Sequence, residues 1–258
     1  MVEAVAGKLT VIGLGPGNAG QITPEAHEAL CAADVLFGYQ PYLDRVPERA
    51  GQRREGSDNR QEIDRAAQAL AAAASGAHAA VVSGGDPGVF AMAAAVCEAL
   101  EHGPVAWREL ELAIVPGVTS MLAVAARVGA PLGHDFCTMS LSDNLKPWSV
   151  IERRLRSAAE AGFVIALYNP ISRARPWQLD RAFETLREHL PGATAVVFGR
   201  AVGRADERVR VTVLSAAQGA DADMATCVIV GSSETRIVER PHRSALVYTP
   251  RSTPASST

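Results

Sequence analysis

The sequence predicts an α/β fold of two α/β/α lobes, with a mostly parallel N-terminal sheet, a mixed C-terminal sheet and a cofactor cleft between the lobes. In the first half, β-branched runs end at glycine-rich turns and continue as helical stretches, which is typical of buried parallel strands joined by crossover helices. In the second half, residues 208–213 alternate Arg with Val or Thr, the period of a half-exposed, antiparallel strand. We expect lobes over residues 1–128 and 134–248 and a disordered tail over 249–258.

The first lobe reads as an alternating series of strands and helices. Thr23 and Pro24 provide an N-cap and a first helical residue for a helix that ends at Ala33. Gly76 ends a second, alanine-rich helix. The strands are predicted over residues 8–14, 35–37, 79–83 and 112–115, and the further helices over 61–75, 89–102 and 119–128.

The pattern breaks at residues 129–133 (GAPLG), which we interpret as a hinge between the lobes. Two short apolar runs near the end of the chain could pair at an edge. The second-lobe strands are predicted over residues 136–141, 163–168, 195–199, 208–213, 226–231, 236–239 and 245–248, and its helices over 147–161 and 176–189.

Three glycine-centred turns each close an apolar strand of the first lobe. They read VIGLGPG at residues 11–17, VVSGGDPGVF at 81–90 and IVPGVTS at 114–120. Ligands of open α/β sheets bind beyond the carboxyl ends of the strands, so three such turns on one sheet predict a ligand site.

Several common sites are excluded by the residues around these turns. Asn18 stands where the dinucleotide fingerprint needs its third glycine, and Pro16 lacks the amide hydrogen of a phosphate-binding loop. Neither Lys8 nor Lys146 lies in a G-K-[ST] motif. His27 begins HEALC, one ligand short of a zinc-protease motif, and Val81 replaces the first glycine of a serine-hydrolase elbow.

Composition narrows the class further. The 258-residue chain is 48% hydrophobic and carries a net charge of −3, which gives no case for nucleic-acid binding. No stretch is long and apolar enough to predict a membrane span or a signal peptide. The four cysteines are scattered without a C-x-x-C motif, so we expect a cytoplasmic protein with buried thiols, no disulfide framework and no metal site.

Taken together, the motifs resemble those of a known family. GLGPG, GGDPGVF and PGVTS, at their spacing, resemble the tetrapyrrole (corrin and porphyrin) methylase family, and the similarity runs from about residue 9 to residue 248. The second-half motifs LSDNLKPW (141–148), YNPIS (168–172) and GRAVGR (199–204) resemble members that methylate C-17 of a corrin precursor in cobalamin synthesis. The resemblance implies S-adenosylmethionine as cofactor, a tetrapyrrole substrate and a homodimer.

The resemblance also implies which residues form the site. Those expected at the cofactor are Leu14, Gly84, Gly85, Asp86, Val89, Phe90, Thr119, Ser120, Leu167, Tyr168 and Ala201. Those expected at the substrate are Gly15, Pro16, Ser142, Asp143, Asn169, Ser172 and Arg173. Bare glycines have a physical rationale here, because a missing Cβ lets a ligand approach the main chain closely.

Some residues have a structural interpretation beside the functional one. Asp86 is either an N-cap at Pro87 or a carboxylate that accepts hydrogen bonds from the cofactor. Thr119-Ser120 is an ordinary helix start, and Tyr168-Asn169-Pro170 an ordinary strand end and turn. We interpret the arginines at 45, 49, 53 and 54 as a solvated face, whereas Arg173 and Arg175 could meet a polycarboxylate substrate.

Catalysis is expected to depend on positioning. The catalytic residue is unknown, and His134-Asp135 is the one histidine pair kept open. The activity implied by the resemblance is transfer of a methyl group to C-17 of precorrin-3B, with contraction of the ring to give precorrin-4. The alternatives are a sibling acting at C-11 or C-20, a diphthine-synthase-like methyltransferase, and a non-catalytic cofactor-binding module.

Overall fold

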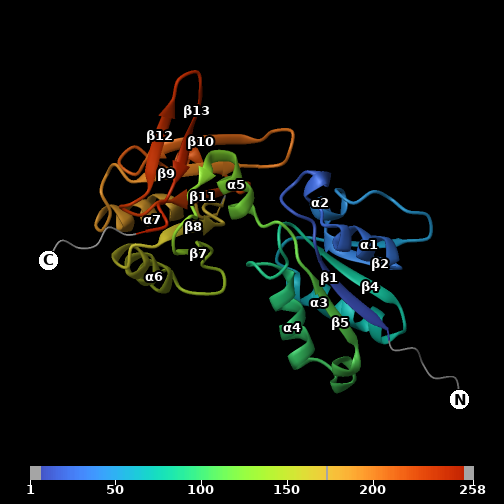
Figure 1. Ribbon diagram of the computed structural model, residues 1–258. Helices are drawn as coiled ribbons and strands as arrows, with labels where there is room; N and C mark the ends of the chain where they lie inside the picture. Colours follow the sequence, from blue (N-terminus) through green and yellow to red (C-terminus); the bar gives the residue numbers. More distant parts are fainter. Residues whose placement is uncertain (1–6, 173, 253–258) are drawn as a thin grey trace, which may run out of the picture. The chain divides into compact units, whose positions relative to one another are not determined.

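The computed structural model describes residues 7–172 and 174–252. The chain forms two compact units, Met1–Thr119 and Ser120–Thr258, each with a five-stranded sheet (Figure 1). The predicted fold class is confirmed. The units divide before helix α5 (Ser120–Val128) rather than after it, because α5 packs on strands of the second unit.

The sheet of unit 1 is entirely parallel, in the order β3-β2-β4-β1-β5. Val11 in the central strand lies level with Val81 on one side and Ile114 on the other. All four strands predicted for this half are present. The five strands are β1 (Lys8–Gly13), β2 (Val35–Tyr39), β3 (Arg53–Ser57), β4 (His78–Ser83) and β5 (Glu111–Val115).

Helices cover both faces of this sheet, as parallel sheets require. On one face Leu9 and Val11 pack with the alanine-rich helices α3 and α4, and on the other Ile12 and Leu14 pack near α1 and α2. Alternate residues of β1 thus serve two cores. The helical segments are η1 (Ala19–Gln21), α1 (Pro24–Ala32), α2 (Gln40–Leu43), α3 (Glu62–Ala74), α4 (Met92–His102) and η2 (Val105–Glu109).

Strand β3 and the arginines before it depart from the prediction. β3 has the sequence RREGS and pairs in parallel with β2 through its main chain, so no apolar pattern marks it. The solvated-face interpretation is wrong for two arginines. Arg54 donates hydrogen bonds to the carbonyls of Leu43, Val46 and Pro47, and Arg45 to those of Leu14 and Gly15.

Unit 2 contains the predicted mixed sheet, in the order β10-β9-β11-β8-β7. Only the β7–β8 pair is parallel, and β10 is antiparallel to β9 as its alternation predicts. Gly199 lets Val124 of α5 pack against β9, because a Cβ there would lie 2.2 Å from the Val124 side chain. The strands are β7 (Phe136–Ser140), β8 (Val164–Tyr168), β9 (Ala195–Arg200), β10 (Arg208–Val213) and β11 (Thr226–Val230).

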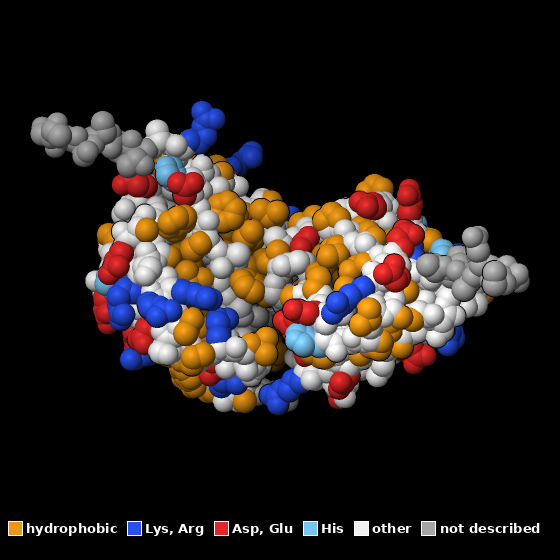
Figure 2. Space-filling view, turned by 90° about the horizontal axis from the view of Figure 1, so that it is seen from below, with side chains coloured by type: hydrophobic (Ala, Val, Ile, Leu, Met, Phe, Trp, Pro, Cys, Tyr) orange, Lys and Arg blue, Asp and Glu red, His pale blue; other side chains and the backbone are white. Residues whose placement is uncertain are grey.

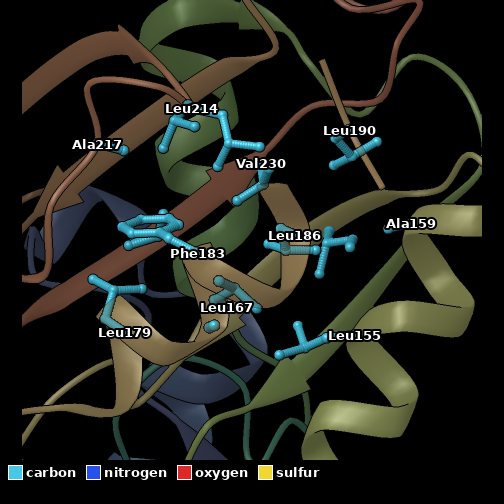
Figure 3. Packing of buried hydrophobic residues seen from close by; sticks show 14 of the residues in the cluster. Leu155, Ala159, Leu167, Leu179, Phe183, Leu186, Leu190, Leu214, Ala217 and Val230 are labelled. Atoms are coloured by element: carbon cyan, nitrogen blue, oxygen red, sulfur yellow. The ribbon is translucent and has the colours of Figure 1, made fainter. Parts of the chain in front are cut away.

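Helices α6 (Trp148–Glu160) and α7 (Gln178–Arg187) complete the main core of unit 2, and η3 (Gly219–Asp221) follows β10. The fully buried ring of Phe183 lies among Leu179, Leu167 and Leu214 (Figure 3). It meets Phe198 of β9 edge-on, with the ring centroids 6.1 Å apart.

A third, small sheet closes unit 2. The predicted pairing of β12 (Arg236–Arg240) with β13 (Arg243–Tyr248) is confirmed, and β13 also pairs in parallel with the two-residue strand β6 (Gly129–Ala130). The tail prediction is wrong at its first residue. Thr249 is buried, and its hydroxyl donates to the Pro131 carbonyl at 2.6 Å, while residues 253–258 lie outside the described residues.

In the part of the chain that the structure describes, no helix combines the length and apolar character needed to cross a bilayer.

Candidate functional site

The three glycine turns of unit 1 meet main chain to main chain at the carboxyl edge of the sheet. Gly15 and Gly85 form an antiparallel bridge, with N–H···O distances of 3.1 and 2.9 Å. A Cβ on Gly117 would lie 2.3 Å from the Gly85 carbonyl oxygen, and one on Gly13 would lie 2.6 Å from the Gly117 nitrogen. Side chains at these positions would force the turns apart.

Gly85 differs from its neighbours because space remains beside it. Its φ is +70°, and a Cβ there would approach no atom more closely than the Thr119 Cα at 3.8 Å. Gly84 is instead covered by the ring of Tyr42. Phe90 also has positive φ, at 52°, and its side chain is 49% exposed. The segment 84–90 therefore presents main chain and an aromatic ring at one place.

Asp86 ties two of the turns together. Its Oδ1 accepts from the Gly88 amide at 2.8 Å and its Oδ2 from the Gly117 amide at 3.0 Å. The N-cap interpretation is wrong, because α4 begins at Met92 and its N-cap is Ala91. Asp86 closes a turn within its own segment and fixes the Gly117 turn beside it.

The remaining predicted residues of unit 1 differ in what they expose. The Leu14 side chain is buried in the apolar core, so it can offer a ligand only its main chain. Gly15 and Pro16 are also buried, and Val89 is half-buried. Thr119 is 5% exposed and ends the unit. Arg45 places its positive charge on this loop, since its Nη2 lies 2.9 and 2.8 Å from the Leu14 and Gly15 carbonyl oxygens.

Unit 2 gathers its motifs at one edge of its own sheet. Strands β7, β8 and β9 run in the same direction, since β8 and β9 are both antiparallel to β11. Their carboxyl ends therefore share an edge, and the residues that follow them are Ser142 and Asp143, Asn169, and Ala201. Ser120 opens α5 at the same edge, because the Met121 amide donates to the Tyr168 hydroxyl at 3.0 Å.

The strained backbone positions of this edge coincide with predicted site residues. Asn169 and Ala201 have φ values of 50° and 48°, in the left-handed region that few residues other than glycine adopt. Asn169 is held there by a hydrogen bond from its Nδ2 to the Ser140 Oγ at 2.9 Å. The Leu167 side chain is fully buried in the core, so it resembles Leu14 in offering only main chain.

Asp143 is engaged within the protein. Its Oδ1 lies 2.9 Å from the Arg175 Nε and accepts from the Gln178 Nε2 at 3.0 Å. Arg175 also donates to the Asn144 side chain, and Ser172 pairs with Arg175 in a short bridge. These contacts join the LSDNLKPW segment to the residues after YNPIS. Gln178 has no sequence signal that would have identified it.

Two predicted residues fall elsewhere. Arg173 lies outside the described residues. His134 and Asp135 precede β7, so they lie at the opposite edge of the sheet from Ser142 and Tyr168. The histidine pair that the sequence kept open is therefore separate from the gathered motifs.

Lysine and arginine side chains gather on the surface of unit 2, on the left in Figure 2. Lys146 is among the cations of this unit and is half-buried, with its Nζ 3.4 Å from the Ser142 carbonyl oxygen. Its burial, and secondarily the charge of Arg154, lower the pKa of Lys146. The described residues of both edges supply main-chain groups, hydroxyls, amides and cations, which suits binding and orientation of an anionic ligand.

Comparison with known proteins identifies the family. The model of the Tetrapyrrole (Corrin/Porphyrin) Methylases matches residues 8–218. This chain belongs to that family. A Sinorhizobium protein named precorrin-3B C(17)-methyltransferase is 66% identical over 96% of the chain and 97% of its own length. A Salmonella typhimurium protein named probable cobalt-factor III C(17)-methyltransferase is 39% identical over 94% of the chain and 98% of its own length.

A solved structure of tetrapyrrole methylase type agrees over the whole fold. The crystal structure of the methyltransferase CobJ is 48% identical, covers 95% of this chain and 100% of its own, and has a TM-score of 0.90. The family resemblance that the glycine motifs carry is confirmed.

Proposed function

We propose that this methylase transfers a methyl group from S-adenosylmethionine to C-17 of precorrin-3B during cobalamin synthesis, with contraction of the macrocycle to give precorrin-4. The observation that carries the proposal is the 66% identity, over almost the full length of both chains, to a protein named for this reaction. The second-half motifs favour the same reaction.

The methyl donor fits the edge of unit 1. The main chain at Gly85 is uncovered where a Cβ would otherwise stand, and the half-exposed Phe90 ring lies in the same segment. An aromatic face attracts a cation such as a sulfonium. We propose that Gly84, Gly85, Asp86, Val89, Phe90, Thr119 and the main chain of Leu14 hold the donor, together with Ser120, Tyr168, Ala201 and the main chain of Leu167.

When bound, S-adenosylmethionine supplies a methyl group on a good leaving group. The chain's own contribution is then to hold two reactants in line, and alignment of this kind supplies roughly 7–11 kcal/mol. The positive-φ backbone at Gly85, Asn169 and Ala201 suits this role, because segments fixed by neighbouring hydrogen bonds hold their geometry.

The substrate is a macrocycle with several carboxylate arms, and the protein is itself net negative. Binding therefore requires local cations. We propose that the Gly15-Pro16 turn, Ser142, Asn169, Ser172 and Arg173 border the macrocycle. Asp143 contributes indirectly, because it is paired with Arg175 and orients that guanidinium.

The main competing reaction differs in whether the substrate carries cobalt. The Salmonella relative is named for cobalt-factor III, but its identity is 39% against 66% for the precorrin-3B relative. A sibling reaction at C-11 or C-20, a diphthine-synthase-like activity and a non-catalytic role receive no support from these names.

The test is incubation of the purified protein with methyl-labelled S-adenosylmethionine and, in separate reactions, precorrin-3B or cobalt-factor III without oxygen. Label at C-17 of a ring-contracted product from precorrin-3B is the expected result. Label in another position, label only with the cobalt substrate, or an unlabelled tetrapyrrole would overturn the proposal.

We further propose a homodimer that works in the cytoplasm. The cysteines at 31, 97, 137 and 227 are all free thiols, which suits a reducing compartment. Light scattering coupled to size exclusion measures the oligomeric state directly.

A further inference from the structure

A polar cavity of about 320 Å³ lies in unit 1 beyond the turns described above. It is lined by Ser57, Gln61, Asp64, Arg65, Ala67 and Gln68, from the carboxyl end of β3 and the first turns of α3. Because β3 is parallel to its neighbours, the cavity is at the same edge of the sheet as the glycine turns. No motif of the sequence marks it.

Arg65 is the unusual residue of this cavity, since only 3% of it is exposed. Its Nε donates to the Ser57 Oγ at 2.7 Å, its Nη2 to the Asp58 carbonyl at 2.7 Å and its Nη1 to the Met92 Sδ at 3.3 Å. All three acceptors are neutral, and a thioether is a weak one. Among the described residues, no carboxylate lies within ion-pair distance of this guanidinium; Glu62 acts on it only from farther away.

A buried cation without a counter-charge is unfavourable by several kcal/mol. Burial accordingly lowers the pKa of Arg65. An anion in the adjacent cavity would restore the missing charge and accept the remaining N–H groups in the paired geometry that carboxylates favour.

The other lining residues supply matching donors. The Ser57 hydroxyl accepts from Arg65, so its own hydrogen can be donated to a ligand. Gln61 accepts from the Asp58 amide through Oε1, which leaves its amide nitrogen as a donor. Asp64 is the one lining carboxylate; its position is exposed and its charge opposes an anion.

We propose that this cavity binds a carboxylate arm of the tetrapyrrole, with Arg65 as its charged anchor and Ser57 and Gln61 as additional donors. The inference rests on the proposed function and deepens it. Met92 links the cavity to the cofactor segment, because it contacts Arg65 and opens the helix directly after residues 84–90. A substrate arm held here is therefore close, along the chain, to the proposed methyl-donor site.

The test measures the Kd of precorrin-3B, by quenching of tryptophan fluorescence without methyl donor, and the Kd of S-adenosylhomocysteine by calorimetry. For Arg65→Gln we expect the tetrapyrrole Kd to rise about 10- to 100-fold, the loss expected for a charged hydrogen-bonded pair, with the S-adenosylhomocysteine Kd within about twofold of wild type. Asp64→Asn should leave tetrapyrrole binding unchanged or tighten it. Arg53→Gln is the matched control, because it removes an equal charge from an exposed position of β3.

Equal tetrapyrrole affinity of Arg65→Gln and wild type would overturn the inference. Parallel loss of both ligands would also overturn it, because Arg65 would then only position the segment around Met92. If Arg65→Gln does not fold, Gln61→Ala at an exposed position replaces it, with an expected two- to fivefold rise in the tetrapyrrole Kd (about 0.5–1 kcal/mol) and no rise as the contrary result. Failure of the wild-type protein to bind precorrin-3B at all would instead refute the proposed function.

Discussion

Gly85 shows how a single missing side chain can serve both the fold and a ligand. It has a left-handed backbone, its main chain is bonded to Gly15, and the direction of its absent Cβ is open. Gly117 is glycine for another reason, since a Cβ there would strike the Gly85 carbonyl. The two positions therefore predict different consequences of substitution.

Gly85→Ala is expected to weaken S-adenosylhomocysteine binding about tenfold or more, equivalent to about 1.4 kcal/mol. The left-handed conformation itself should cost about 1–2 kcal/mol of folding stability. Gly51→Ala is the control, because Gly51 has a φ of +81° and a methyl group added to it would meet nothing within 4 Å, yet it lies away from the glycine turns. Calorimetry should separate the two variants, while thermal unfolding should not. A Gly85→Ala protein that binds S-adenosylhomocysteine normally would remove this residue from the donor site.

At the scale of single residues, the sequence located the glycines well and the side-chain partners poorly. The glycine turns are local patterns, so the sequence itself contains them. The bond between Tyr168 and Met121 joins residues far apart along the chain, as does the pair of Asp143 and Arg175. Nothing in either segment alone indicates its partner, so Asp143 was predicted at the substrate when it holds an arginine.

Among the structural elements, α5 and the loop after β9 are joined by a two-point ion pair. Arg127 Nε lies 2.6 Å from Glu207 Oε1, and Arg127 Nη2 lies 3.2 Å from Oε2. Oε2 also accepts from the Gly203 amide at 2.7 Å. The pair thus fixes the loop that carries Ala201, whose positive φ needs support from its surroundings.

Glu207→Gln should lower the free energy of unfolding by less than about 1 kcal/mol, because the pair is partly exposed to solvent. A double-mutant cycle with Arg127→Met isolates the pair from other contacts. The hydrogen bonds from Arg127 and Gly203 lower the pKa of Glu207. The coupling should therefore be present above the pKa of the unfolded carboxyl, about 4.3, and disappear as pH falls through the lower folded value. Coupling that is equal at about pH 7 and about pH 3 would contradict this assignment.

The elements that the sequence predicted are those with a buried apolar pattern. β1, β4 and β8 are β-branched runs whose side chains fill the cores, so their composition reveals them. β3 and β6 could not be found in this way. The first is a charged edge strand and the second is two residues long, and both exist because a neighbouring strand offers main-chain hydrogen bonds.

Across the whole molecule, several surface carboxylates are held charged by arginine or lysine. Hydrogen bonding to Lys8 lowers the pKa of Glu111, and hydrogen bonding to Arg200 lowers that of Asp206. Burial opposes ionisation of Asp223, but hydrogen bonds from Arg200 and Thr226 still bring its pKa below the usual range.

Because these carboxyls have lower pKa values folded than unfolded, their contribution is complete above the unfolded values and is lost as pH falls through the folded ones. The melting temperature should therefore be steady near neutrality and fall progressively below about pH 4. Added salt should reduce this dependence, since the pairs are exposed and screened. Scanning calorimetry between about pH 7 and about pH 3, at low and high salt, measures both effects. A melting temperature that rises on acidification would show that these pairs are unimportant.

The small sheet of unit 2 has a consequence for how the protein is made. β6 and Pro131 are synthesised long before β13 and Thr249, the partners that satisfy them. A nascent chain leaving the ribosome must therefore hold α5 and β6 without their final neighbours until translation is nearly finished. A stop codon ahead of β13 would strip a contact from the middle of the polypeptide as well as removing its end.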